Sequence, residues 1–161
     1  MTKTRIKFRR YAFAVVFRKN DADRKHENGE KYSFLVFHRK KNWRGWEILK
    51  GGLMGDESEI QALKREIREE TGAKKYKIVA KTRHTITYRW SKFYRKDHHI
   101  YHGAKGRVFI VRVFDKRVKI DRKEHDKFMW ADKTKALKLL TYINLKNALK
   151  YVLRNHKLDT S

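Results

Sequence analysis

The chain of 161 residues carries 43 Lys and Arg against 18 Asp and Glu, which gives a formal net charge of +25 at pH 7. Hydrophobic residues make up 40% of the chain and aromatic residues 13%, enough to bury a core, so a disordered polycation is excluded. Cysteine is absent, which excludes disulfides, thiol nucleophiles and zinc–thiolate sites and agrees with a reducing, cytoplasmic location.

The N-terminal part of the sequence predicts two β-strands. Residues 9–19 (RRYAFAVVFRK) and 31–40 (KYSFLVFHRK) are rich in aromatic and β-branched residues. A polar connection with an Asn28-Gly29 turn signal separates them. The basic and then apolar start is similar to a short signal peptide, but RKND follows where small cleavage-site residues belong, so a first strand is the better interpretation. We expect no membrane span, because no apolar run approaches the required length of about 18 residues.

A helix is predicted from Ser58 to Thr71. Ser58 can cap its N-terminus, and Gly72 can end it in the left-handed conformation. Helical spacing predicts a buried face made by Ile60, Leu63 and Ile67.

Three carboxylates of this helix, Glu66, Glu69 and Glu70, lie within an arc of about 100° beside the apolar face. Unpaired, they would repel one another and favour partial protonation. A divalent cation removes this conflict, and hard oxygen ligands suit Mg²⁺ or Mn²⁺. Arg65, four residues before Glu69, is placed to pair with it and hold its orientation. The alternative is a solvated helix with ordinary salt bridges.

The C-terminal part predicts two more strands and a helical end. Residues 77–90 (KIVAKTRHTITYRW) and 106–114 (GRVFIVRVF) read as strands, and residues 91–106 between them as a long basic loop. Residues 132–140 (DKTKALKLL) and 144–157 (NLKNALKYVLRNHK) predict helices. The second has one apolar face, made by Leu145, Ala148, Leu149, Val152 and Leu153. This order of elements indicates an α/β sandwich around a mixed β-sheet.

The acidic helix belongs to a longer pattern that resembles the Nudix box, Gly-x5-Glu-x7-Arg-Glu-aliphatic-x-Glu-Glu-x-Gly-aliphatic. Its positions are filled by Gly51, Glu57, Arg65, Glu66, Ile67, Glu69, Glu70, Gly72 and Ala73. Family members usually count the second glycine of the Gly-Gly pair, whereas here the first, Gly51, gives the correct spacing. The loop after it is therefore one residue shorter than usual. A match at every fixed position argues against the solvated-helix alternative.

The resemblance implies a single Nudix domain over residues 1–161, an α/β/α sandwich, and Mg²⁺-dependent hydrolysis of a nucleoside diphosphate linked to another group. A metal bound to pyrophosphate oxygens would position the phosphorus and lower the pKa of the attacking water. By the same resemblance Glu66, Glu69 and Glu70 bind the metal, and the last two are also catalytic. Arg65 would orient a carboxylate, and Glu57 would support the site.

Outside the box the chain is similar to diadenosine tetraphosphate hydrolases and RNA pyrophosphohydrolases. Residues 46–52 (WEILKGG) are like their W-x-x-P-K-G-G segment, with Leu49 in place of proline. This makes Lys50 a phosphate contact beside Gly51 and Gly52. Residues 100–113 (IYHGAKGRVFIVRV) map the phosphate-binding lysine of that subgroup onto Lys105.

The C-terminal similarity covers residues 124–149, where an acid precedes an aromatic-Trp strand and two helices. Glu124 falls where that subgroup often supplies another catalytic or metal-linked carboxylate. A solvated acid at a strand entrance is the alternative.

Four aromatic residues are candidates for stacking on a base: Tyr88, Tyr94, Tyr101 and Trp130. Core packing is the alternative for each of them. Tyr94 and Tyr101 are the stronger candidates for substrate binding, because they belong to the basic loop. The sequence offers no further metal ligands near His98, His99 and His102. We interpret them as polar loop residues.

The charge of +25 predicts a polyanionic partner, such as a polyphosphate, a nucleic acid or the ribosome. A solvated surface adapted to an unusual cytoplasm is the alternative. The leading hypothesis is hydrolysis of a dinucleoside polyphosphate of the diadenosine tetraphosphate type. Two other hypotheses stay open: removal of pyrophosphate from RNA 5′ ends, and a basic nucleic-acid-binding or ribosome-associated protein with vestigial catalysis.

Overall fold

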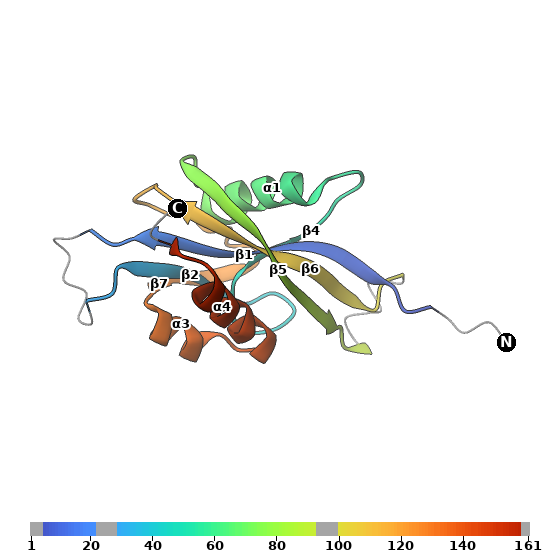
Figure 1. The fold of residues 1–161 in the computed structure, drawn as a ribbon. Coiled ribbons are helices and arrows are strands. Elements are labelled where there is room, and N and C mark those ends of the chain that lie inside the picture. Colours follow the sequence, from blue (N-terminus) through green and yellow to red (C-terminus); the bar gives the residue numbers. More distant parts are fainter. Residues whose placement is uncertain (1–4, 22–28, 93–99, 159–161) are drawn as a thin grey trace.

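A computed structural model describes residues 5–21, 29–92 and 100–158 of the chain. They form a mixed seven-stranded sheet with helices on both faces (Figure 1), which confirms the expected α/β sandwich. The elements, in chain order, are β1 (Phe8–Lys19), β2 (Tyr32–Arg39), β3 (Gly45–Glu47), β4 (Leu49–Gly52), α1 (Glu59–Thr71), β5 (Tyr76–Arg89), β6 (Gly103–Val113), β7 (His125–Ala131), α3 (Lys133–Leu139) and α4 (Ile143–Asn155).

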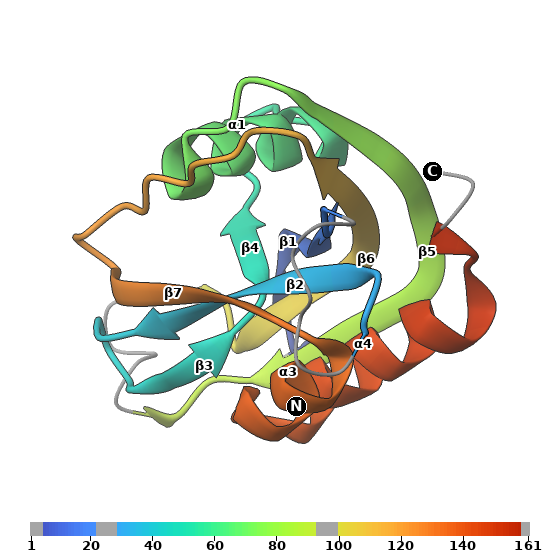
Figure 2. The same ribbon diagram turned by 90° about the vertical axis from the view of Figure 1, so that its left-hand side faces the viewer.

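The sheet divides beside β1, where β2 and β4 pair with different parts of that strand. Its main path runs β3-β2-β1-β6-β5, while β4 pairs with β1 and β7 pairs with β2. β1 and β6 are parallel, and the other pairs are antiparallel. β1 pairs with β2 only at its end, from Phe17 to Lys19, and with β4 from Tyr11 to Ala14. β4 therefore leads the chain out of the sheet toward α1, as Figure 2 shows.

Two cores fill the two faces of the sheet. The core under α1 contains Phe37, Leu63, Ile67 and Phe109. The core on the other face, which α3 and α4 cover (Figure 2), contains Phe13, Phe17, Leu145, Leu149 and Val152. The strand alternation that separates these two sets also decides which side chains reach each face near the site.

α1 begins and ends as its sequence predicts. Ser58 accepts a hydrogen bond from the Gln61 backbone N–H, and the Gln61 side chain accepts one from the Ser58 N–H, which completes a capping box. Gly72 ends the helix with φ 66° in the left-handed region. The buried face is predicted less well, because Ile60 is 38% exposed and Ala62 is buried instead.

The predicted strands and both C-terminal helices are confirmed, with three differences. Residues 103–106 belong to β6, so the predicted basic loop is shorter than expected. The sequence predicts no strands at β3 and β4, because each has only a few residues. Leu153 is half-buried at the edge of the α4 face. Within the described ranges, no helix is both long enough and apolar enough to cross a bilayer.

Candidate active site

Glu66 lies against β4. It is buried, and a β-carbon at Gly51 would collide with its side chain. Burial raises the pKa of Glu66 to about 7 against the opposing effect of Arg65, and repulsion by Glu70 and Glu69 adds to the rise. Keeping this carboxylate ionised at neutral pH is therefore costly unless a cation comes close.

Arg65 donates to four groups in and beside the box. Its Nε and Nη2 donate to the two Glu57 carboxylate oxygens over 2.8 and 3.0 Å, and Nη2 also donates to the Gly52 carbonyl over 3.0 Å. Its Nη1 donates to Glu66 Oε1 over 2.7 Å. The expected contact with Glu69 is the longest, at 3.4 Å, so Arg65 mainly orients Glu57 and Glu66. The Arg65 hydrogen bonds hold the pKa of Glu57 at about 2.

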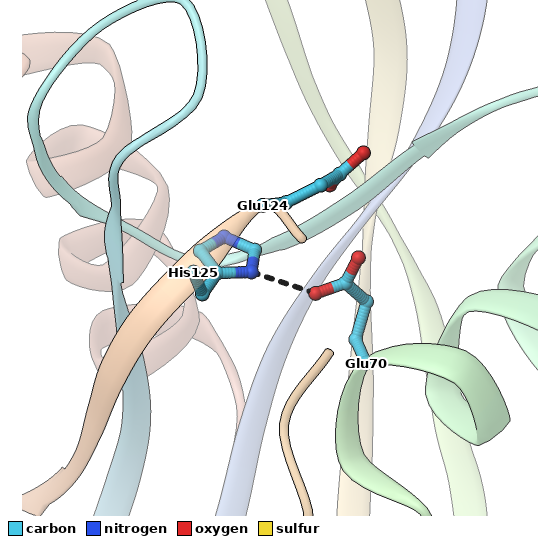
Figure 3. A group of neighbouring side chains, drawn as sticks. All are labelled: Glu70, Glu124 and His125. Atoms are coloured by element: carbon cyan, nitrogen blue, oxygen red, sulfur yellow. Dashed lines mark ion pairs between the residues drawn. The ribbon is translucent and has the colours of Figure 1, made fainter. Parts of the chain in front are cut away.

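A second carboxylate of α1 meets residues from the start of β7. Glu70 is 4% exposed, and its Oε2 lies 2.8 Å from Nδ1 of His125 (Figure 3). Glu124 lies beside them, and one potential ligand atom from each of the three residues falls within 4.8 Å of the others. The structure thus brings the predicted Glu124 into contact distance of the box.

His125 connects this group to a buried carboxylate of β3. Its Nε2 lies 2.7 Å from Oε1 of Glu47, which is 1% exposed. Burial alone would lower the pKa of His125, but the carboxylates of Glu47 and Glu70 raise it to about 9. Burial raises the pKa of Glu70, and His125 opposes that rise.

Two cations also pair with Glu47, one at each carboxylate oxygen. Lys50 Nζ lies 3.1 Å from Oε2 of Glu47, and Arg39 Nη1 donates to Oε1 over 3.1 Å. Burial would raise the pKa of Glu47, but Lys50, His125 and Arg39 together lower it to about 2. Lys50 also contacts the Tyr88 hydroxyl at 3.4 Å. The residue expected to contact phosphate is therefore engaged with a buried carboxylate.

Lys50 and Lys105 face opposite sides of the sheet. Leu49 belongs to the core under α1 and Ala104 to the other core, so the alternating neighbours Lys50 and Lys105 point in opposite directions. Lys105 is exposed and lies beside Arg10 of β1. The two predicted phosphate contacts are not brought together.

The predicted stacking residues lie in different surroundings. Tyr88 packs against the core beside Lys50, and Trp130 packs at 4.4 Å under the Arg18 guanidinium. Tyr101 is 37% exposed, and Tyr94 lies outside the described residues, as do His98 and His99.

Sequence reasoning missed three residues of this site: Arg39, Glu47 and His125. Each was adjacent to a residue or motif already considered. Glu47 sits between Trp46 and Ile48 in an apolar stretch, where a lone acid signals a buried pair. Only the three-dimensional pairing reveals its partners.

The residues present fit a divalent metal ion. Glu70 and Glu124 supply oxygen donors close to one another, and Glu66 and Glu69 add a buried and an exposed carboxylate on the same helix. Glu70 Oε2 and His125 Nδ1 are buried and, among the described residues, neither has a partner in hydrogen-bond geometry. Buried polar atoms without such a partner are typical of a place that an ion completes.

Comparison with known proteins places this site in a family context. A family profile described as "NUDIX domain" matches residues 8–152. Among curated proteins, the RNA pyrophosphohydrolase of Nitratiruptor sp. is 29% identical over 96 residues, which is 59% of this chain and 62% of that protein. The RNA pyrophosphohydrolase of Sulfurovum sp. is 32% identical over 84 residues, 52% of this chain and 54% of that protein. The chain therefore matches less than two thirds of the length of either relative.

Solved structures share the fold over nearly the whole chain. A Caenorhabditis elegans Ap4A hydrolase binary complex has a TM-score of 0.70 at 20% identity and covers 91% of this chain and 96% of that one. The Escherichia coli dihydroneopterin triphosphate pyrophosphohydrolase has a TM-score of 0.69 at 16% identity, covering 94% and 100%. At these identities the likeness establishes the fold alone.

Proposed function

The chain belongs to the Nudix family, and from this we propose that it is a metal-dependent pyrophosphohydrolase that cleaves a phosphoanhydride bond of a nucleotide polyphosphate. The meeting of buried Glu70 of the box with Glu124 and His125, beside the buried box residue Glu66, carries the proposal. Arg65 donates to one of the two buried box carboxylates, Glu66, and His125 pairs with the other, Glu70.

The proposed chemistry divides the work among these residues. A divalent ion, when bound, would neutralise phosphate charge and lower the pKa of a coordinated water. Glu66 and Glu70 would hold the ion through buried carboxylates, while Arg65 keeps Glu57 and Glu66 in place. The side chains of Glu69 and Glu124 are 53% and 35% exposed, which suits them to face the substrate and accept the proton of the attacking water.

As the substrate we propose the triphosphorylated 5′ end of an RNA. The names of the curated relatives support this choice. The sequence alone favoured the dinucleoside polyphosphate, through similarity to the C-terminal end of its hydrolases. A dinucleoside polyphosphate is therefore the second candidate, supported by that similarity and by the fold shared with the Ap4A hydrolase.

A strip of basic side chains also supports an RNA substrate. We call it the basic strip; it consists of Arg10, Arg89, Lys105 and Arg107. The strand registers set Arg10 beside Lys105 and place Arg89 and Arg107 two residues to either side along the same face. All but the half-buried Arg107 are exposed.

The basic strip begins where the box loop leaves the sheet. The Leu53 N–H donates to the Arg10 carbonyl over 2.9 Å, so this loop rests on β1 at the strip. From there β1, β5 and β6 extend beyond the end of α1 (Figure 1). A single-stranded polyanion lying on this surface would lead toward the box. Glu59 is an acidic residue that pairs with the strip, 3.5 Å from Arg10.

A substrate panel tests the proposal. Purified protein is mixed with Mg²⁺ or Mn²⁺ and triphosphorylated RNA, diadenosine tetraphosphate, ADP-ribose or nucleoside triphosphates. We expect kcat/KM to be highest for the RNA near 0.15 M salt, where the Debye length is about 8 Å. A clear preference for diadenosine tetraphosphate would make a dinucleoside polyphosphate the proposed substrate instead. No turnover of any compound would favour a binding protein with vestigial catalysis.

A further inference from the structure

We propose that His125 is itself a metal ligand, so that Glu70, Glu124 and His125 form a mixed oxygen–nitrogen site that prefers transition-metal dications such as Mn²⁺ and Co²⁺ to Mg²⁺. The inference rests on the proposed function in one respect: it assumes that the carboxylates of the box bind a metal. It assigns a nitrogen donor that the sequence pattern did not indicate.

The imidazole of His125 is oriented with one nitrogen toward each of two carboxylates. Nε2 lies 2.7 Å from Glu47 Oε1, which leaves Nδ1 facing Glu70 Oε2 at 2.8 Å. Figure 3 shows that Nδ1 and the Glu70 carboxylate face each other, with the Glu124 side chain next to both. One donor atom of each residue lies within 4.8 Å of the others, which is close enough for a single ion to contact all three.

The pair at the centre of this group is a buried ion pair between His125 and Glu70. His125 and Glu70 are each 4% exposed, and their facing atoms are buried. Yet within the described residues neither Nδ1 nor Oε2 has a partner in hydrogen-bond geometry. Two buried, ion-paired atoms that lie off hydrogen-bond geometry are placed so that a cation replacing the imidazole proton could contact both.

Glu47 gives His125 the support that metal-binding histidines have. Such a histidine usually donates its other ring N–H to a carboxylate, which fixes the tautomer and the ring orientation. Glu47 fills this place at Nε2, and Arg39 and Lys50, each 3.1 Å away, keep its charge in position. A metal ion would replace the proton on Nδ1, while Nε2 keeps its own toward Glu47, and the freed lone pair of Nδ1 would then be directed toward Glu70 and Glu124.

The nitrogen donor determines the preferred ion. Mg²⁺ binds oxygen almost exclusively and keeps several waters, whereas transition-metal dications also accept imidazole nitrogen, with an affinity that rises from Mn²⁺ to Co²⁺. The alternative is that His125 only holds Glu70 in place through their ion pair and binds no metal. In that case removal of the imidazole should weaken the binding of all metals alike. If His125 is a ligand, the affinity for transition metals should fall selectively.

Metal binding without substrate separates these roles. Metal-free full-length protein, without an affinity tag, is titrated calorimetrically with Mg²⁺, Mn²⁺ and Co²⁺. The wild type should bind Mn²⁺ and Co²⁺ at least about 10-fold more tightly than Mg²⁺. His125→Gln should lose about 10- to 100-fold of that affinity and little affinity for Mg²⁺. His38→Gln is the matched control, because His38 pairs with Asp126 at 2.7 Å outside the group.

A spectroscopic readout on the wild type makes the test independent of variant folding. Electron spin-echo measurements on the Mn²⁺-loaded protein should detect a directly bound ¹⁴N, unchanged in His38→Gln. Absence of that coupling, or equal losses for all three metals in His125→Gln, would overturn the ligand assignment. Failure of the enzyme would look different: metal would still bind through His125, but no compound of the panel would be hydrolysed.

Discussion

The Glu66 side chain occupies the space beside Gly51 in which a β-carbon would stand. The first glycine of the Gly-Gly pair is therefore required for a close approach and not for a turn. This contact explains why the box counts from Gly51, since that residue lies on the α1 face of β4 and Gly52 on the other.

Gly51→Ala should displace Glu66 and lower kcat by at least about 100-fold, because a shift of about 1 Å in a catalytic group has that effect. The cost in unfolding free energy should be about 1–3 kcal/mol, measured by urea denaturation. Gly55→Ala is the control. Gly55 has open space around it but a φ of 50°, so its substitution strains the backbone without touching Glu66. Equal activity loss in both variants would contradict the role of Gly51.

Arg65→Lys should lower kcat by about 10- to 100-fold while the protein stays folded. Lysine keeps the charge but cannot bind both oxygens of Glu57 and reach Glu66 and the Gly52 carbonyl together. Arg68→Lys, an exposed change on the same helix, is the matched control and should be silent. Wild-type kcat in Arg65→Lys would show that the fork of contacts is dispensable.

Local patterns in the sequence predict the box helix well. Its cap at Ser58, its end at Gly72 and the glutamates are within a few residues of one another, so spacing alone relates them. The arc estimate also places Glu66 and Glu70 beside the apolar stripe, and the structure buries both. The prediction for Ile60 is wrong: it lies in the first turn of the helix and is 38% exposed, while Ala62 takes a buried position.

Contacts between distant segments were not predictable in the same way. Glu47 and His125 are 78 residues apart and meet only because β2 pairs with both β3 and β7. Lys50 and Lys105 were grouped as phosphate contacts, but strand parity turns them to opposite faces. A shift of one residue in strand register moves each side chain to the opposite face of the sheet, and amino-acid composition carries no information about that register.

Glu70→Gln and Glu69→Gln should each abolish most activity and leave the fold intact, because each removes an anionic ligand and preserves shape. They should differ in metal-free stability. Glu70 is buried beside His125, whereas the Glu69 side chain is 53% exposed. Glu70→Gln should therefore change the unfolding midpoint and Glu69→Gln should not. Near-normal turnover of both variants at saturating metal would refute the metal assignment.

The metal-free protein should lose stability as pH rises from about 5 to 9. Glu66 has a folded pKa of about 7, above its usual 4.5, so its ionisation costs stability from pH 4.5 upward and fully above pH 7. The size is on the order of 3 kcal/mol. His125 has a pKa of about 9 in the folded state, above its usual 6.5, so its contribution is complete below 6.5 and is lost as pH rises through 9.

Chemical denaturation in a chelator, repeated at several pH values, measures this slope. Glu66→Gln should flatten it between pH 4.5 and 7 and leave the decline toward pH 9. Saturating metal should reverse the slope, because the ion favours the deprotonated ligands. A wild-type slope in Glu66→Gln would show that another group titrates in that window.

The last prediction concerns the basic strip, which should govern capture of long substrates and not the chemical step. Lys105→Ala combined with Arg89→Ala should raise KM for triphosphorylated RNA and leave kcat unchanged, because both side chains lie on the exposed strand ends beyond α1. Each lost phosphate contact should also lower the slope of log KM against log salt by about 1. Lys135→Ala with Lys150→Ala removes the same charge from exposed sites on α3 and α4, and should change KM less. Equal effects of the two double variants would mean that net charge alone attracts the RNA, and an unchanged KM in both would remove the strip from substrate binding.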